Sequence, residues 1–372
     1  MQPVKFIDSL TPLRGIAALI VVFFHYDAFL MISGFSRLIP LEASSFIARG
    51  YLWVDFFFIL SGFVICHVYG TKLSAPGEGT IKKYIWARFS RIYPLHAFVM
   101  IVLAIHYSVM LVVTPKLAEE WKAFYGLKEF FLQLFFLDAF GLVDHWGWNV
   151  PSWSVASEWW IYLVAILIIP FLNKNRKVQT TVAFALGLLG LLLIHLMDTG
   201  SAPGTSLGRI AGTFQCLFEF TIGVSVYQIY KTIRDQQTIW SKDWMMFLVV
   251  IGVILILHFD VYPVFIIPFF SAFLLCASLN TGLPSRFLNS KPLVFLGDVS
   301  YSIYLTHVFW MFSLGRLWVE LYFKPTYPGV APTYVDHFFW LTTMLTFLIG
   351  FSYLTYRYVE LPAQKKLRSF IR

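Results

Sequence analysis

An arginine and a histidine stand eleven residues apart in the first long apolar stretch of the chain. This stretch, SLTPLRGIAALIVVFFHY, covers residues 9–26 and contains Arg14 and His25. In a helix the two would be separated by about 16 Å along the axis and would share a similar face, because eleven residues make about three turns. A charge at the centre of a bilayer costs ~3 kcal/mol or more, so such residues face a bundle interior or a cavity. The pattern predicts a fixed cation near the membrane surface and, at mid-depth, an imidazole suited to proton transfer.

A second histidine is expected at the depth of His25. His307 lies about ten residues inside a later apolar stretch and follows Ser300, Tyr301 and Tyr304. Residues 300, 304 and 307 fall along one helix face. A hydrogen-bonded seam between helices explains this row as well as a substrate-binding role does. For His25 the corresponding alternative is a core histidine bonded to a neighbouring hydroxyl.

Two carboxylates are expected a turn or more inside the membrane. Asp55 begins the apolar run DFFFILSGF, and Glu158 lies in PSWSVASEWW. Each carboxylate either pairs with an arginine elsewhere in the bundle, or orients an imidazole or binds a substrate hydroxyl. Trp153, five residues before Glu158, belongs either to an interfacial aromatic belt or to a surface that stacks against a sugar ring.

A basic segment, IKKYIWARFSRIYP, covers residues 81–94 and contains Lys82, Lys83, Arg88 and Arg91. Its apolar residues follow helical spacing, so we expect it to lie along the cytoplasmic interface. An anchor that follows the positive-inside rule accounts for these charges. Arg88 and Arg91 share a face, so they could also bind phosphate groups bidentately.

The composition indicates an all-α polytopic membrane protein. Of the 372 residues, 58% are hydrophobic and only 13% are charged, whereas soluble domains carry about 25% charged residues. We expect a single integral membrane domain over residues 1–372. Basic residues lie in short loops rather than in one patch, which argues against nucleic-acid binding. The cysteines fall inside apolar runs and are expected to be core residues, and no metal site is expected.

About ten apolar stretches are long enough to cross a bilayer. They cover residues 10–32, 51–69, 92–114, 153–171, 178–197, 208–230, 244–260, 262–280, 298–322 and 336–358.

The distribution of basic residues predicts the orientation of these stretches. Basic residues place the loops 72–91 and 174–177 and the segment 365–372 in the cytoplasm, whereas the loop 198–207 has none and is expected outside. These assignments alternate only if the apolar segment 127–143 does not cross. We therefore predict that 127–143 is a re-entrant or interfacial helix and that both termini are cytoplasmic.

Taken together, these motifs resemble the acyltransferase-3 family of integral membrane acyltransferases, over nearly the whole chain. The resemblance is carried, in chain order, by SLTPLRGIAALIVVFFHY, WVDFFFILSGF, RFSRIYP, NVPSWSVASEWWIYL, LGDVSYSIYLTH and YRYVELP.

The resemblance implies transfer of an acyl group, usually acetyl, from cytoplasmic acetyl-CoA or a similar acyl-CoA to a hydroxyl of a cell-surface polysaccharide or lipid-linked glycan. It also implies a multi-pass protein of the bacterial cytoplasmic membrane, here of the standalone type without a fused extracytoplasmic hydrolase-like domain. His25 matches the family's essential catalytic histidine, and Arg14, Arg88 and Arg91 match arginines that serve activity and donor handling.

Combining residues and resemblance, we expect His25 to act as a general base or to carry a transient acetyl group. The expected roles are catalysis for His25, Arg14 and Glu158; donor binding for Arg88, Arg91, Arg14, Lys82 and Lys83; and acceptor binding for Asp55, Trp153, Tyr301 and His307.

Two other functions fit the same residues. Intramembrane histidine, arginine and glutamate also suit a proton-coupled transporter of an anionic or sugar-linked solute, although the two halves show no matched pair of broken helices. An acyltransferase that modifies a small cytoplasmic molecule, such as a macrolide, is the second alternative.

Overall fold

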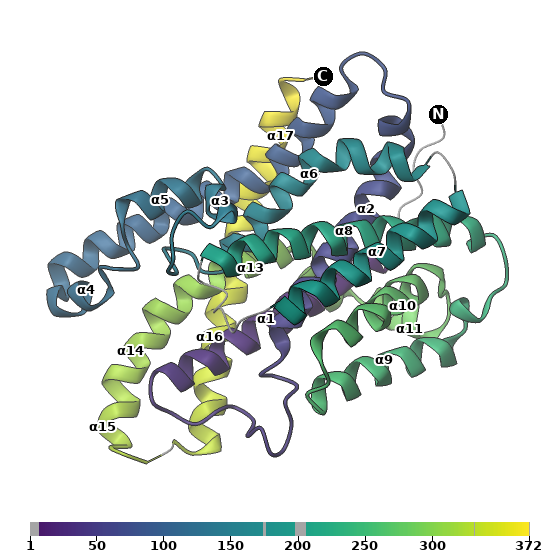
Figure 1. Ribbon diagram of the computed structural model, residues 1–372. Coiled ribbons are helices and arrows are strands. Elements are labelled where there is room, and N and C mark those ends of the chain that lie inside the picture. Colours follow the sequence, from purple (N-terminus) through teal and green to yellow (C-terminus); the bar gives the residue numbers. More distant parts are fainter. Residues whose placement is uncertain (1–6, 174–175, 198–205, 331, 372) are drawn as a thin grey trace. The chain divides into compact units, whose positions relative to one another are not determined.

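The structure is a computed structural model that describes residues 7–173, 176–197, 206–330 and 332–371 (Figure 1). Every regular element in these ranges is a helix, which confirms the predicted all-α class. Among the described residues, seven helical stretches are long and apolar enough to cross a membrane. They are α1 (Leu10–Ile32), α2 (Trp53–Ser74) with its preceding turn, α3 (Thr80–Val113), α6 (Ser152–Asn173), α7 (Arg176–Met197), α8 (Ser206–Ile233), and α16 (Tyr334–Thr355) with α17 (Leu361–Ser369).

The other three predicted crossings are also helical, but in shorter or interrupted pieces. Helices α9 (Asp243–His258) and α10 (Ile266–Leu279) have 16 and 14 residues. The stretch 298–322 is covered by α13 (Ser300–Trp310) and a helical run with two π-helical turns, which contains α14 (Arg316–Trp318) and ends at α15 (Lys324–Thr326). Fourteen residues reach about 21 Å, less than the ~30 Å hydrocarbon core. Helices α9 and α10 are thus short for a crossing, and the crossing of all three stretches stays a prediction.

The segment 127–143 forms only α5 (Leu127–Leu134) and a short turn at Leu137–Phe140. Eight helical residues reach about 12 Å, so this segment is too short to cross, in agreement with its prediction as a re-entrant or interfacial element. A further short helix, α4 (Pro115–Trp121), precedes it.

Residues 81–94, which are expected to lie along the cytoplasmic interface, do not form a helix of their own. These residues form the first part of α3, which continues through Pro94 as one helix of 34 residues. Such a helix is about 51 Å long, which exceeds the ~30 Å hydrocarbon core. Its basic first turns can therefore project beyond the core instead of lying flat along the cytoplasmic interface. Two loops used to predict orientation, at 174–177 and 198–207, fall largely outside the described residues.

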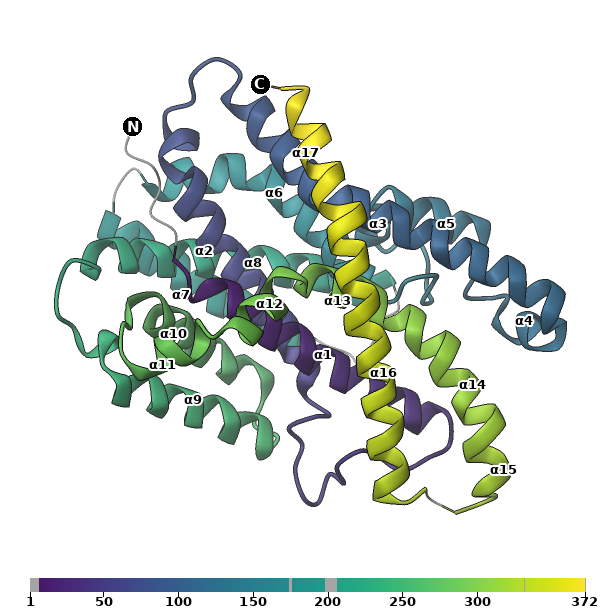
Figure 2. The same cartoon turned by 180° about the vertical axis from the view of Figure 1, so that it is seen from behind.

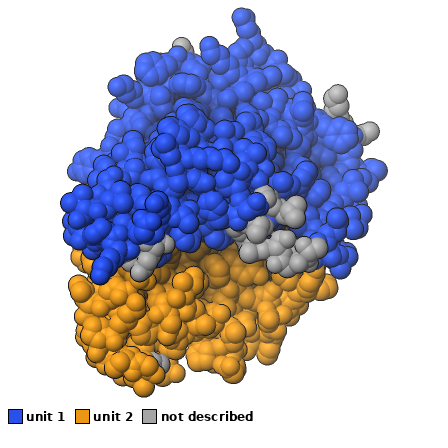
Figure 3. All heavy atoms as spheres, turned by 60° about the vertical axis from the view of Figure 1, so that its left-hand side comes forward, with its two compact units in different colours: residues 1–6, 58–237, 357–372 blue, residues 7–57, 238–356 orange. Residues whose placement is uncertain are grey.

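The chain divides into two compact units, and each is described by itself (Figure 3). The α1 unit comprises residues 7–57 and 238–356. The α3 unit comprises the described residues of 58–237 and 357–371. The boundaries fall inside α2, in the segment between α8 and α9, and in the π-helical turn between α16 and α17.

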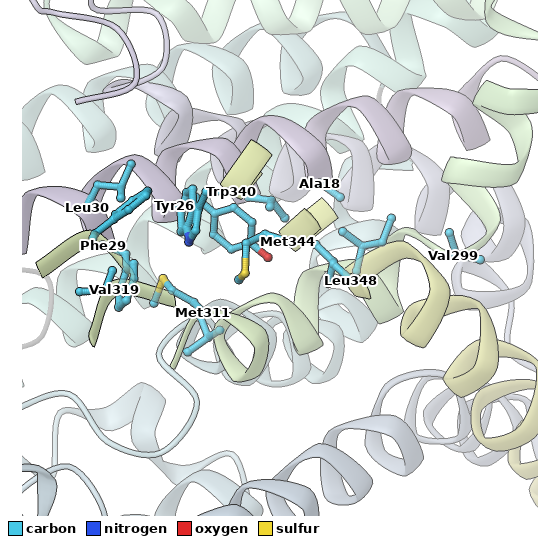
Figure 4. Packing of buried hydrophobic residues seen from close by; sticks show 14 residues of the cluster. Ala18, Tyr26, Phe29, Leu30, Val299, Met311, Val319, Trp340, Met344 and Leu348 are labelled. Carbon is cyan, nitrogen blue, oxygen red and sulfur yellow. The ribbon is translucent and has the colours of Figure 1, made fainter. Parts of the chain in front are cut away.

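The core of the α1 unit is built where α1, α13 and α16 pack together (Figures 2 and 4). Trp340 on α16 is completely buried, with its ring 5.5 Å from that of Tyr26 and 6.3 Å from that of Phe29 on α1. On the cytoplasmic side of the predicted topology, Gly15 meets Gly297 of α12 (Lys291–Asp298) so closely that a Cβ atom on either would overlap the other helix. Because α13 follows α12 almost directly, this contact sets the position of α13 against α1.

The α3 unit contains a comparable backbone contact between α2 and α8. A Cβ atom on Gly62 would overlap the carbonyl oxygen of Phe220, and one on Gly223 would overlap the carbonyl oxygen of Ile59. Small residues at such crossings let two helices approach closely, which strengthens packing where lipid supplies no hydrophobic driving force.

Replacing Gly223 with alanine should therefore destabilise the protein. The added methyl group meets backbone that cannot rotate away, and overpacking of this kind costs ~1–3 kcal/mol. The measurement is the thermal unfolding midpoint in detergent. Gly350→Ala on α16 is the matched control, because its Cβ meets nothing within 4 Å and alanine favours a helix over glycine by ~1 kcal/mol. Equal midpoints for the two variants would contradict the close crossing.

Candidate active site

The two histidines that the sequence placed at similar depth lie against each other in the α1 unit. His25 is on α1 and His307 is on α13, and their ring centroids are 4.8 Å apart with 55° between the ring planes. Residues 282 positions apart in the chain are thus brought into one contact by the packing of α1 against α13.

Hydrogen bonds to backbone carbonyls define which nitrogen of each ring carries the proton. His25 Nδ1 lies 2.9 Å from the carbonyl oxygen of Val21, and His307 Nδ1 lies 2.8 Å from that of Tyr304. A carbonyl oxygen only accepts, so Nδ1 donates in both rings and Nε2 of each neutral ring keeps a lone pair. Within the described chain, the buried Nε2 of His307 has no hydrogen-bond partner. Both rings are therefore in the form that can accept a proton or a hydrogen bond.

Aromatic side chains surround the pair. The ring of Phe24 lies 4.9 Å from that of His25, and the ring of Tyr304 lies 6.0 Å from that of His307 and 5.8 Å from that of Phe57. Such walls limit the access of water, which strengthens electrostatic interactions at the two Nε2 atoms.

The other predicted site residues of the α1 unit lie at other positions along their helices than the histidine pair. Arg14 is half-buried and stands about 16 Å from His25 along α1. Tyr301 is half-buried in the first turn of α13, about 9 Å before His307 along that helix. Asp55 is buried in the first turn of α2.

In the α3 unit, Arg88 lies among tyrosines. Its Nη2 donates to the hydroxyl of Tyr69 at 3.2 Å, and its guanidinium carbon lies 5.0 Å from the ring centre of Tyr69 and 5.8 Å from that of Tyr162. Arg88 forms no ion pair with any residue that the structure describes, and its buried Nε has no partner there. Its charge is stabilised by π-systems and a hydroxyl rather than by a carboxylate.

Glu158 belongs to the same cluster through Tyr162, which lies one turn further along α6. The Tyr162 hydroxyl donates to Glu158 Oε1 at 2.5 Å and accepts from the Ser61 hydroxyl at 3.0 Å. The Tyr84 hydroxyl donates to the backbone carbonyl of Tyr162 at 2.9 Å. Glu158 forms no ion pair among the described residues, so the alternative of an arginine partner is not what the structure contains.

The remaining predicted residues of the α3 unit differ in their surroundings. Arg91 forms an ion pair with Glu360, which is buried in the closing YRYVELP motif. Lys82 and Lys83 are exposed at the start of α3. Trp153 begins α6 with its ring 6.2 Å from that of Phe58.

The tyrosines around Arg88 and the acidic partner of Arg91 were not predicted from the sequence. Tyr162 could have been found, because it stands four residues after Glu158 in a helix and so shares its face. Glu360 carried a weaker signal, namely a carboxylate next to a long apolar run.

Polar side chains of α5 and of the segment between α5 and α6 hold the beginning of α6 in place through hydrogen bonds. The Gln133 side chain donates to the carbonyl of Gly147 and accepts from the backbone N–H of Asn149, both at 3.0 Å. Ser152, the first residue of α6, donates to Asp138 at 3.4 Å. Burial raises the pKa of Asp138 to about 7, an effect that the charge of Arg209 opposes.

The histidine pair of the α1 unit and the cluster of Arg88, Tyr162 and Glu158 in the α3 unit are both set inside apolar helices. They define a polytopic membrane protein whose reactive groups face its interior. The model of the acyltransferase domain family matches residues 7–357. The chain belongs to this family, acyltransferase-3.

Curated relatives are similar to most of this chain. It is 26% identical to the peptidoglycan O-acetyltransferase OatA of Listeria monocytogenes, over 97% of this chain and 56% of the relative. It is 24% identical to the O-acetyltransferase OatA of Staphylococcus aureus, over 98% of this chain and 58% of the relative. The chain thus spans a little over half the length of these relatives.

A shorter similarity covers 28% of this chain and 47% of "Protein 2 in picA locus" of Rhizobium radiobacter, with 41% identity. No solved structure matches the chain significantly.

The raised pKa of Asp138 predicts a pH dependence of stability. A carboxyl group whose folded pKa is about 7, against ~3.9 when unfolded, stabilises the fold below about pH 4 and loses that contribution as the pH rises to about 7. Asp138→Asn is neutral throughout, so its unfolding midpoint should fall less than that of the wild type between about pH 5 and about pH 8. Asp235→Asn, an exposed change in the same unit, is the control. Parallel curves for wild type and D138N would show that Asp138 titrates normally.

Proposed function

We propose that this chain is a membrane O-acyltransferase that moves an acyl group, in the simplest case acetyl, from a coenzyme A thioester to a hydroxyl of a saccharide. The observation that carries the proposal is the contact between His25 and His307, each with Nδ1 bonded to a carbonyl. Family membership supports acyl transfer. The printed names of the OatA relatives support O-acetylation and, for one of them, a peptidoglycan acceptor. The proposed location is the bacterial cytoplasmic membrane, with the acceptor a cell-surface glycan.

In this proposal His25 Nε2 is the general base. It takes the proton of the acceptor hydroxyl while the oxygen attacks the thioester carbonyl, and His307 Nε2 accepts a hydrogen bond that holds the acceptor. The carbon–sulfur bond then breaks, and the thiolate leaves with the proton that His25 returns. No net proton is gained or lost, and a positioned base of this kind accelerates such a step by about 10²–10⁴-fold.

The coenzyme A moiety of the donor is proposed to bind along α3. Coenzyme A is polyanionic, and the exposed Lys82 and Lys83 precede Arg88 by about 9 Å or less along α3. Arg88 carries a charge that no described carboxylate pairs, so an anionic group can gain a charge-assisted hydrogen bond there. Arg14 is proposed to act at the predicted cytoplasmic end of α1.

The other expected residues keep supporting roles in the proposal. Glu158 is proposed to act through Tyr162, because the hydrogen bond between them fixes the ring that lies over Arg88. Asp55, Trp153 and Tyr301 are proposed to contact the acceptor, and Arg91 to position α3 through its ion pair with Glu360.

Replacing His25 with asparagine should lower acetyl transfer by about 10²–10⁴-fold, the contribution of a general base. The assay is thiol release from acetyl-CoA by purified protein, together with mass spectrometry of cell-surface glycans. His195→Asn is the control, because His195 makes the same type of bond, from Nδ1 to the Leu191 carbonyl at 2.9 Å, on α7. Normal transfer in H25N would refute the role of His25. An intact protein that releases no thiol but moves a solute would favour the transporter.

Arg88→Ala should weaken donor binding more than Arg91→Ala does. Loss of a hydrogen bond to a charged group costs ~1.5–3 kcal/mol, which corresponds to about 10–150-fold in KM for acetyl-CoA. Arg91→Ala removes the ion-pair partner of the buried Glu360, so its main effect should be a lower unfolding midpoint. The two readouts are KM and thermal stability. If R91A raised KM more than R88A without a loss of stability, the assignment of the two arginines would be reversed.

A further inference from the structure

A cavity of about 370 Å³ lies within the α1 unit, between the loop that follows α1 and the segment from α15 towards α16. Figure 2 shows the course of these helices. Its lining includes Ser33, Phe35 and Ser36 from the loop after α1, and Lys324, Tyr327 and Gly329 from the other side. The volume falls within the ~300–1,000 Å³ of typical small-molecule sites.

The charges next to this cavity are already paired. Lys324 is its one charged lining residue, and Lys324 Nζ lies 2.7 Å from Glu320, which also binds Arg316 at 2.7 Å. Tyr327 donates its hydroxyl proton to Asp336. This hydrogen bond raises the pKa of Tyr327, so its hydroxyl stays neutral. The cavity therefore offers no unpaired charge that would select an ionic ligand.

The lining instead combines hydroxyl groups with aromatic rings. Ser33 Oγ is buried and has no hydrogen-bond partner among the described residues, and an unsatisfied buried hydroxyl is costly unless a ligand or water bonds it. Ser36 and Tyr327 add further hydroxyls, and Phe35 adds a ring that is held 5.3 Å from that of Phe323. Hydroxyl partners beside an aromatic surface suit a molecule with polar edges and an apolar face, as a sugar ring has.

The cavity shares its helix with the proposed base. Ser33 follows His25 by eight residues, so the two lie about 12 Å apart along α1, at its predicted outer end. That distance is too long for the cavity to hold the reacting hydroxyl itself, but it suits a neighbouring unit of an extended chain.

We infer that this cavity is a binding subsite for an uncharged, hydroxyl-bearing sugar ring of the acceptor, beside the unit that is acylated. The inference rests on the proposed function, which supplies the reason for a saccharide to approach this end of α1. It names the substrate class more narrowly, as a neutral oligosaccharide rather than a single sugar or an anionic polymer.

The test is direct binding of neutral tetrasaccharides to the full chain in lipid nanodiscs, by saturation-transfer NMR titration. The probes are chitotetraose and maltotetraose, with trigalacturonate as the anionic comparison. Ser36→Trp fills the cavity, and Ala43→Trp is its control, since both positions are exposed in the same loop and Ala43 does not line the cavity. Ser33→Ala removes only the unpartnered hydroxyl.

We expect at least one neutral probe to bind the wild type and A43W alike. S36W should weaken that binding by about tenfold or more and S33A by about fivefold, equivalent to ~1.4 and ~1 kcal/mol. The inference is overturned if neither neutral probe binds, if S36W binds like A43W, or if trigalacturonate binds more tightly. Thiol release from acetyl-CoA is measured in parallel. Its absence would refute the proposed function, while the binding data would still decide the subsite.

Discussion

The hydrogen bond from His25 Nδ1 to the carbonyl of Val21 determines what this imidazole can do. It uses an acceptor from the previous turn of the same helix, so this hydrogen bond does not depend on a residue of another helix. Because Nδ1 donates, Nε2 is left as the basic nitrogen, and His307 repeats the arrangement one helix away. The packing of the α1 unit preserves this geometry: Gly15 and Gly297 bring α12 against α1, and the buried Trp340 fills the space between α16 and α1.

Polar groups inside apolar helices are unfavourable in free energy, and the two arginines of RFSRIYP are stabilised in different ways. Arg91 is neutralised by Glu360. Arg88, only one turn away on the same helix, is surrounded by tyrosines and keeps a charge that no described carboxylate offsets. Two arginines that look equivalent in RFSRIYP thus have different chemistry: one is suited to holding helices together and the other to meeting an anion.

Hydropathy predicted the helices well because a span must be long and apolar whatever packs against it. The stretch predicted at 10–32 coincides with α1, and 178–197 lies within α7. The sequence did not show that the helix over 81–94 continues, because an amphipathic segment looks the same whether its helix stops at the interface or continues through Pro94. The similar depth of His25 and His307 could be predicted from the sequence. Their contact, like the pairing of Arg91 with Glu360, 269 residues away, depends on helix packing that no local pattern encodes.

The central claim is that a thioester reaches the space beside His25 Nε2. The most direct measurement is an experimental structure of the whole chain in a lipid nanodisc with a non-hydrolysable acetyl-CoA analogue. We predict that the carbonyl carbon lies about 5 Å from Nε2, which leaves room for a hydroxyl that is hydrogen-bonded to the ring at ~2.8 Å and lies ~3 Å from the carbon. An analogue bound with its acyl group away from the histidine pair, or His25 with Nε2 facing lipid, would contradict it.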